Sequence, residues 1–308
     1  MNEDNAIGPT TRARRDQSVD AGLSFLVSTQ EPSGSWDLSC RVDGSEPTKA
    51  NGLFSTTAVL LAVGQLLPED TVQRAIDFII SCRNPSGNWF FDASLGVPDD
   101  ADDTACALAA VARFRPAAIS ASDVDYLLEY WRGPDGPFRT WHPASDEIAE
   151  FWSFPSTDDA IVNCNVILAL TELGFTCPRE MLVAVEDLVR ATTSTRYYCG
   201  VAPIAHAAAR VGVLDALNDD VRILQPTESW NSLQLSNWMS ARPAEAPNFT
   251  SHLLAFQQSD GGWPDDDWCT GNIVPPTVWG SRSASTAFAL EALVGMTLVN
   301  QRSESSRA

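Results

Sequence analysis

The chain has 308 residues, of which 44% are hydrophobic, and 40 Asp and Glu against 20 Lys and Arg give it a formal net charge of −20. This composition supplies a sizeable core but repels phosphate backbones, which argues against nucleic acid as a partner. It leaves room for a small anionic ligand, which would need local arginines or a bridging cation. No apolar run of the sequence has the length of a signal peptide or a membrane span, and the seven cysteines are scattered and odd in number. These features predict a cytoplasmic protein with reduced thiols.

Two kinds of helix alternate along residues 16–300. Helices with one apolar and one polar face are typical of an outer layer, and they are predicted at 16–30, 69–83, 121–132, 179–193 and 248–258. Helices that are apolar nearly all round suit an inner layer, and they are predicted around 57–63, 104–111, 163–170, 196–212 and 286–293. Residues 215–242 supply one further pair. Six inner and six outer helices predict an all-α fold, an (α/α)6 barrel, between a disordered arm at 1–15 and a disordered tail at 301–308.

A short motif recurs where outer helices end. The stretches "QEPSGSW" (30–36), "RNPSGNW" (83–89) and "QQSDGGW" (257–263) share Gln or Arg, three residues, Gly, one residue and Trp, and "RGPDGPF" (132–138) is a worn copy. The motif indicates that a helix ends at Gln or Arg, that the chain turns at Gly, and that Trp packs back over the turn. Trp36, Trp89 and Trp263 are therefore expected to hold the repeat turns.

Four carboxylates stand immediately before or at the start of one inner helix, in "GVPDDADDTACALAAV" (96–111). They are Asp99, Asp100, Asp102 and Asp103. One interpretation is helix capping, which would also lower the pKa of the capping acid through the helix dipole. One or two side chains satisfy the free N–H groups, however, so four acids in five positions exceed what capping needs. The other interpretation is a store for a proton, because like charges held close together cannot all ionise.

The repeats together with Asp-x-Asp-Asp, here "DADD" (100–103), resemble the class II terpene cyclases, a family that includes squalene–hopene cyclases, oxidosqualene cyclases and copalyl or drimenyl diphosphate synthases. The similarity spans roughly residues 16 to 298. Members of that family usually have two α-barrel domains, whereas this chain has the length of one, the domain with the acid motif. The squalene-type enzymes hold their acid with a histidine on the following inner helix, where this chain has Asn163 and Asn165.

The resemblance implies a role for each of these residues. Asp102 would be the proton donor, with Asp100 and Asp103 as supporting acids. Asn165, in preference to Asn163, would orient the acid, because an amide N–H can bind the far oxygen of the carboxyl without competing for its proton. The asparagine resembles the arrangement in the family members that act on diphosphates.

A carbocation intermediate requires a dry cavity with aromatic walls. The side chains expected to form it are Trp89, Phe90, Phe91, Trp141, Phe151, Trp152, Phe154, Tyr197, Tyr198, Trp268 and Trp279. Candidate anchors for a substrate diphosphate are Arg139, Arg196 and Arg282. The acids Asp265, Asp266 and Asp267 are candidate ligands for Mg²⁺, which would be needed only with a diphosphate substrate. No organic cofactor is expected.

The resulting hypothesis is a cyclase for a linear isoprenoid, a C15 chain similar to farnesyl diphosphate; a C20 chain or a prenylated aromatic is a further option. Three alternatives stand beside it. Protein prenyltransferase β-subunits have this barrel with a zinc site, and Asp267 and Cys269 fit part of that site, but His142, His206 and His252 all precede them. Barrel glycosidases use paired carboxylates, for which "DEIAE" (146–150) is available. A barrel without activity could bind an isoprenoid or a protein. The sequence leaves the oligomeric state open.

Overall fold

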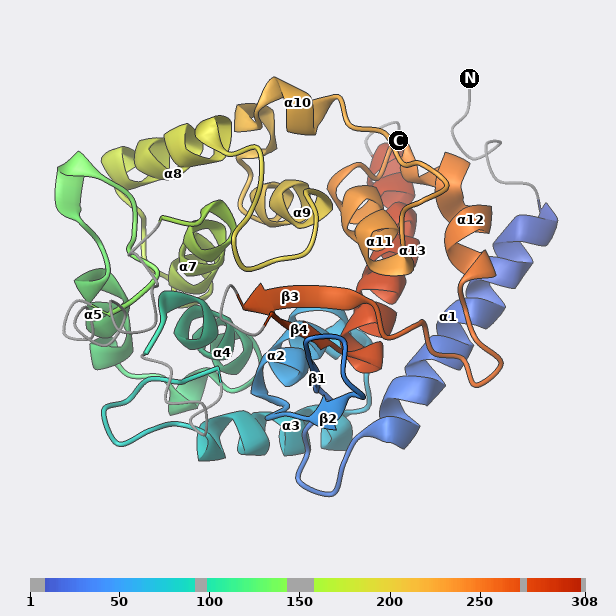
Figure 1. The fold of residues 1–308 in the computed structure, drawn as a ribbon, viewed down its shortest axis with the longest axis horizontal. Coiled ribbons are helices and arrows are strands. Elements are labelled where there is room, and N and C mark those ends of the chain that lie inside the picture. The colour runs from blue at the N-terminus through green and yellow to red at the C-terminus, as the bar shows by residue number, and fades with distance from the viewer. Residues whose placement is uncertain (1–8, 92–98, 143–157, 272–275, 306–308) are drawn as a thin grey trace.

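An inner ring of apolar helices forms the centre of the molecule (Figure 1). The computed structural model describes residues 9–91, 99–142, 158–271 and 276–305. In that part of the chain, each inner helix packs against the next, and the last returns to the first, so the ring is closed. Its members are α2 (Leu53–Val63), α4 (Ala101–Phe114), α7 (Ala160–Glu172), α9 (Ala202–Arg210), α11 (Ser232–Ala241) and α13 (Arg282–Ser305).

A second ring of helices surrounds the first (Figure 1). The difference between the two rings follows from their burial: every residue of α2 is buried, whereas α3 buries mainly the positions of one face, such as Val72, Ile76 and Ile79. The (α/α)6 barrel expected from the sequence is thereby confirmed. The outer helices are α1 (Pro9–Thr29), α3 (Glu69–Ser81), α5 (Ala121–Glu129), α8 (Arg179–Ala191), α10 (Asp219–Arg222) and α12 (Thr250–Ala255).

The first and last helices are longer than the sequence analysis allowed. Helix α1 begins at Pro9 and therefore includes residues 9–15, which were assigned to a disordered arm. Proline suits the first helical position, where its missing N–H is not needed, and no glycine or further proline lies between Pro9 and Asp16. Helix α13 runs to Ser305, into the predicted tail, because nothing after Gly295 stops it. Short 3-10 helices lie at Gly64–Leu66, Pro116–Ala118, Gly133–Asp135, Leu214–Ala216 and Ala246–Phe249.

The three full repeats share one set of contacts around a fully buried tryptophan. The indole N–H donates to a main-chain carbonyl ten residues earlier: Trp36 to Leu26 (2.8 Å), Trp89 to Ile79 (2.7 Å) and Trp263 to Leu253 (3.0 Å). The same residue's backbone N–H donates to a threonine hydroxyl of the next inner helix, Thr56, Thr104 or Thr286. Each tryptophan therefore ties an outer helix to an inner one.

The first residue of each repeat links neighbouring outer helices. Gln30 donates its amide to Gly34 O (3.0 Å) in its own turn and to Thr71 O (2.9 Å) on α3. Gly34 has φ +93°, and a Cβ there would lie 2.2 Å from a carbonyl oxygen of α3, so this turn requires glycine. The other two full repeats have the same arrangement. Arg83 donates to Gly87 O and to the Asp123 carboxylate of α5. Gln257 donates to Gly261 O and to Ser18 O of α1.

A small sheet, which the sequence analysis did not predict, lies at one end of the barrel (Figure 1). Its four antiparallel strands have the order β2-β1-β4-β3. Strand β4 runs almost directly into α13 and β2 almost directly into α2, so the sheet is next to the N-terminal ends of inner helices. These strands are too short for an alternating pattern to be recognised. They are β1 (Ser39–Val42), β2 (Thr48–Lys49), β3 (Asp267–Gly271) and β4 (Thr277–Gly280).

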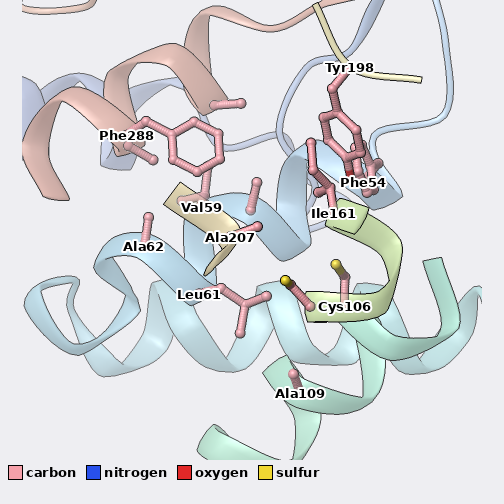
Figure 2. Packing of buried hydrophobic residues seen from close by; sticks show 14 of the residues in the cluster. Phe54, Val59, Leu61, Ala62, Cys106, Ala109, Ile161, Tyr198, Ala207 and Phe288 are labelled. Carbon is pink, nitrogen blue, oxygen red and sulfur yellow. The ribbon is translucent and has the colours of Figure 1, made fainter. Parts of the chain in front are cut away.

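The hydrophobic core lies both inside the inner ring and between the inner and outer rings. Figure 2 shows part of it, with Phe54 and Leu61 from α2, Cys106 from α4, Ile161 from α7 and Phe288 from α13. The seven cysteines are all unpaired, as expected. Among the described helices, none combines the length and apolar character needed to cross a membrane.

Candidate active site

The acidic segment begins α4, and its first buried carboxylate caps that helix. Asp100 is the N-cap residue with extended backbone angles, and its Oδ1 accepts the backbone N–H of Asp103 at 2.8 Å. The segment is fixed from the other side by Ala101, whose N–H donates to Thr140 O at 2.8 Å. Capping is therefore performed by Asp100, which leaves the side chain of Asp102 free for other contacts.

Asp102 points into the barrel and is held by side chains of two neighbouring segments. Its Oδ1 accepts a hydrogen bond from the Asn165 amide on α7 at 2.7 Å, and its Oδ2 accepts one from the hydroxyl of Tyr198, in the loop before α9. The thiol of Cys106, one helical turn further along α4, lies 4.0 Å from Oδ1. Only 9% of Asp102 is exposed.

The surroundings of Asp102 keep its carboxyl protonated far above the ordinary range for aspartate. Burial, followed by the charge of Asp100, raises its pKa from 3.8 to about 7, although the hydrogen bonds from Tyr198 and Asn165 act in the opposite direction. Burial and the charge of Asp100 also raise the pKa of Asp103 well above its usual value. Burial raises the pKa of Asp100 as well, and its bonds to Asp103 oppose this rise. The cluster therefore retains protons near neutral pH.

The two partners of Asp102 differ in what they can do with its proton. The Asn165 Nδ2 group can only donate, so it fixes Oδ1 as an acceptor. A tyrosine hydroxyl can donate or accept, so Tyr198 is compatible with both forms of the carboxyl. The proton of neutral Asp102 is consequently best placed on Oδ2, and the Oδ1 contact still stabilises the carboxylate left after proton transfer.

Of the two candidate asparagines, Asn165 contacts the acid and Asn163 does not take that position. Asn163 accepts the backbone N–H of Phe138 at 2.7 Å and donates to its carbonyl at 3.1 Å. Phe138 takes the place of tryptophan in the worn repeat, and Asn163 takes the place of the repeat threonine. Asn163 is thus a structural residue of the worn repeat at 132–138, while the orienting role of Asn165 remains a prediction supported by its contact.

Tyr198 was expected only as an aromatic wall, and its hydroxyl contact with the acid was not foreseen. The loop that places it is held by the backbone N–H of Tyr198, which donates to Thr195 Oγ1 at 3.2 Å, and by a bridge to Cys269 of β3. The sequence signal for this role was weak. A tyrosine ahead of an inner helix can point toward the barrel, but only the β3 contact fixes its direction.

An aromatic cavity of about 40 Å³ lies beside Asn165 and Tyr198. Phe54 stacks on Trp268 with ring centroids 4.5 Å apart, and Trp268 contacts Phe288 edge-on at 5.8 Å. Phe54 and Phe288 were missed because they lie inside apolar inner helices, where the sequence does not distinguish a cavity wall from core. The volume is below the roughly 300–1,000 Å³ of small-molecule sites. Binding a C15 chain beside the acid therefore requires these side chains to move.

The other predicted aromatic residues occupy several places. Phe91 packs against Phe54 (5.7 Å) and Trp279 (5.1 Å), and so lies next to the cavity wall. Trp141 contacts Tyr197 edge-on at 6.1 Å. Trp89 is a repeat residue, as described above, and Phe90 follows it in the same loop. The predicted residues Phe151, Trp152 and Phe154, and the carboxylates of residues 146–150, lie outside the described residues.

The candidate anchors for a diphosphate lie in three different segments: Arg139 and Arg196 are in loops, and Arg282 is the first residue of α13. Arg282 donates to Gln258 Oε1 (2.5 Å) and Asp260 Oδ1 (2.9 Å) and lies over the ring of Phe25, so it belongs to the last repeat turn. The backbone N–H of Arg196 donates to Asp159 at 3.4 Å. Arg139 directly follows the worn repeat at 132–138. Burial raises the pKa of Asp158, and the charges of Arg132 and Arg139 oppose this rise.

The predicted magnesium ligands each contact other groups of the protein. Asp265 accepts from Ser39 (2.8 Å) and faces Arg41, Asp266 accepts from Ser232 and the backbone of Leu233, and Asp267 pairs with Arg41. Within the described ranges, no group of three His, Cys, Asp or Glu side chains is placed to hold a metal ion. The same finding removes the support for the zinc site of a prenyltransferase β-like subunit in this part of the chain.

Comparison with solved structures places the chain in a known class of fold. No family model matches the sequence, and no curated protein matches it. The structure superposes on the type II terpene cyclase MstE from Scytonema with a TM-score of 0.69 and 15% identity, over 92% of this chain and 97% of that one. A protein from Actinoplanes gives a TM-score of 0.70 and 16% identity, over 92% and 99%. The chain thus has the fold of the type II terpene cyclases.

Two further comparisons show how far the likeness extends. A variant of MstE in complex with its substrate, geranylgeranyl dihydroxybenzoate, superposes with a TM-score of 0.68 and 14% identity, over 94% of this chain and 99% of that one. An unsaturated glucuronyl hydrolase specific for heparin gives a TM-score of 0.51 and 12% identity, over 94% and 98%. The barrel is shared by proteins with different chemistry, so the function has to be argued from the site.

Proposed function

We propose that the chain is a class II terpene cyclase in which Asp102 protonates a terminal alkene of a linear isoprenoid. The observation that supports this most directly is the buried carboxyl of Asp102, with a pKa raised to about 7 and a hydrogen bond on each oxygen. The fold of the type II terpene cyclases, one of which was solved with a prenylated substrate, supports the same reaction class.

The proposed reaction begins with transfer of the Asp102 proton. The O–H bond of Asp102 breaks, and its proton adds to the less substituted carbon of the alkene, which leaves a tertiary carbocation. An internal alkene then attacks the cation and closes a ring, and the last cation transfers a proton to water. Asp102 then takes up a proton from solvent, so that one proton enters and one leaves in each cycle. Asn165 and Tyr198 stabilise the carboxylate that remains, because hydrogen bonds to a charged acceptor are the strong ones.

The walls next to the acid suit the intermediate of this reaction. Phe54, Trp268 and Phe288 offer aromatic faces and edges, and aromatic faces attract a cation without forming a bond to it. Most residues that line the cavity are apolar or aromatic, which keeps bulk water away from a reactive cation. We propose a C15 isoprenoid as the substrate, either as farnesyl diphosphate or with another head group.

The test compares the wild-type protein with two aspartate variants. Each is incubated with farnesyl diphosphate, geranylgeranyl diphosphate and prenylated aromatic acids, with and without Mg²⁺, and the extracts are searched for cyclic products. Asp102→Asn should abolish product while the circular dichroism spectrum is retained. Asp99→Asn is the matched control, because Asp99 belongs to the same acidic segment but contacts Asn88 and Tyr126 instead of the cavity. Wild-type protein that forms no cyclic product from the whole panel would contradict the proposal.

A binding protein without activity is the remaining alternative. It would bind the isoprenoid with the same affinity in wild-type and Asp102→Asn protein and release it unchanged. The raised pKa of Asp102 argues against this alternative. A buried carboxyl with a raised pKa makes the folded protein less stable at neutral and alkaline pH, and it gives no advantage in binding an apolar chain.

A further inference from the structure

A larger cavity lies at the end of the barrel opposite the acid. It has a volume of about 480 Å³, is partly open to solvent, and is lined by the C-terminal ends of five inner helices and by the middle of α13. This volume is in the range of small-molecule sites. Its walls include Val63 of α2, Arg113 of α4, Glu172 of α7, Arg210 of α9, Met239 of α11 and Ala292 of α13.

This cavity adjoins the aromatic cavity beside the acid. Leu61, His206 and Arg210 line both, so the two lie one after the other along the barrel. Arg113 is eleven residues after Asp102 on α4, and at 1.5 Å per residue the two positions are about 16 Å apart along that helix. A linear isoprenoid with its terminal alkene at Asp102 would therefore direct its other end, the head group, into the larger cavity.

The charged groups of this cavity are mostly paired with one another. Arg113 binds the Glu172 carboxylate and also donates to Leu61 O at 2.9 Å. Glu291 lies 2.9 Å from His206 Nε2, and although burial opposes its ionisation, the nearby His206 and Arg210 lower its pKa. Arg210 differs from Arg113, because among the residues that the structure describes it has no hydrogen bond or ion pair. Its guanidinium has five N–H donors to offer to a ligand.

We propose that the larger cavity binds the head group of the isoprenoid, and that Arg210 receives a single carboxylate there. This inference rests on the proposed cyclase function. A head group with one negative charge matches one unpaired arginine. A diphosphate would place several negative charges near Glu172, Glu291 and the C-terminal ends of five inner helices, each of which has a partial negative charge. The carboxylate is therefore favoured over the diphosphate.

The test measures binding in the Asp102→Asn background, where no turnover interferes. The probes are farnesylacetic acid, its methyl ester and farnesyl diphosphate, titrated while tryptophan fluorescence is followed. The acid should bind about tenfold to a hundredfold more tightly than the ester, the range expected for a hydrogen-bonded charge. Arg210→Met and Arg210→Gln should each remove this preference by weakening only the acid. Arg190→Met on the exposed face of α8 is the control and should leave both affinities unchanged.

Several results would overturn the proposal. They are equal affinity for acid and ester in the starting protein, tighter binding of the diphosphate than of the acid, no binding of any probe, or an unchanged preference in a folded Arg210 variant. The first three need no Arg210 variant, so the test stands even if both variants fail to fold. Failure of the cyclase proposal would look different: the acid would bind with the expected preference, while wild-type protein formed no cyclic product.

Discussion

Replacing Asp102 by asparagine should make the protein more stable at alkaline pH. The unfolded chain ionises this carboxyl near pH 3.8, whereas the folded chain does so near pH 7. Between these values the folded state binds more protons than the unfolded state, so stability falls as pH rises. The full interval of about three pKa units corresponds to about 4 kcal/mol, and the part between pH 5 and pH 8 to about 3 kcal/mol. An asparagine of the same shape does not titrate and removes this loss.

The assay is urea unfolding of the wild-type and Asp102→Asn proteins at pH 5 and pH 8, followed by tryptophan fluorescence. The wild-type protein should lose about 3 kcal/mol more than the variant between the two pH values, with the same dependence on urea concentration in both. Asp125→Asn, at an exposed position of α5, is the control and should follow the wild type. Parallel stability curves for wild type and Asp102→Asn, within about 1 kcal/mol, would refute the assignment of a raised pKa to Asp102.

Three further predictions concern the contacts of the acid and the repeats. Tyr198→Phe removes a hydrogen bond that favours the Asp102 carboxylate, so the pKa of Asp102 should rise by about one to two units. The alkaline limb of the pH profile of kcat/KM should move to higher pH by the same amount, whereas Tyr197→Phe should leave it in place. Asn165→Ala should lower kcat by about tenfold to a hundredfold without unfolding the protein; full activity would contradict the orienting role. Gln257→Ala should reduce the free energy of unfolding by about 1–3 kcal/mol in a urea titration and leave kcat unchanged, because its two hydrogen bonds serve the barrel alone.

The barrel could be predicted from the sequence because the same set of contacts recurs in each repeat. The spacing between Gln and Trp is the same in each copy because Trp36 has to reach Leu26 and Gln30 has to reach Thr71. The distribution of apolar residues likewise predicts that α2 is buried at every position and that α3 is buried on one face only. Helix ends were less predictable, as the extended α1 shows, because residues 10–15 are almost all polar and have no apolar periodicity to indicate a helix.

The site could be predicted only where a motif names its residues. Asp102 and Asn165 follow from the acid motif and from the alignment of two inner helices. The hydroxyl contact of Tyr198 depends on a bridge to Cys269, seventy-one positions away, which belongs to a sheet that leaves no periodic signal. Arg210 was also missed, because a basic residue at the last position of a helix is ordinarily explained by the helix dipole alone.

Asp102 lies at a helix N-terminus, where the helix dipole lowers the pKa of a carboxyl. Its pKa is raised nonetheless, because burial raises it by more than the dipole lowers it. The dipole favours the carboxylate by about 0.3–1 kcal/mol, and by about 2 kcal/mol in the most favourable buried geometry. The net rise in pKa, about three units or about 4 kcal/mol, has the opposite sign, so burial and the charge of Asp100 outweigh the dipole and both hydrogen bonds together. Asp100 has a second part in this balance. By accepting the free N–H of Asp103, it satisfies the helix end that would otherwise attract the Asp102 carboxylate. Asp102 can therefore remain protonated beside Asn165 and Tyr198, which line the cavity, and the hydrogen bonds from these two residues limit the rise in its pKa, as an acid that has to lose its proton requires.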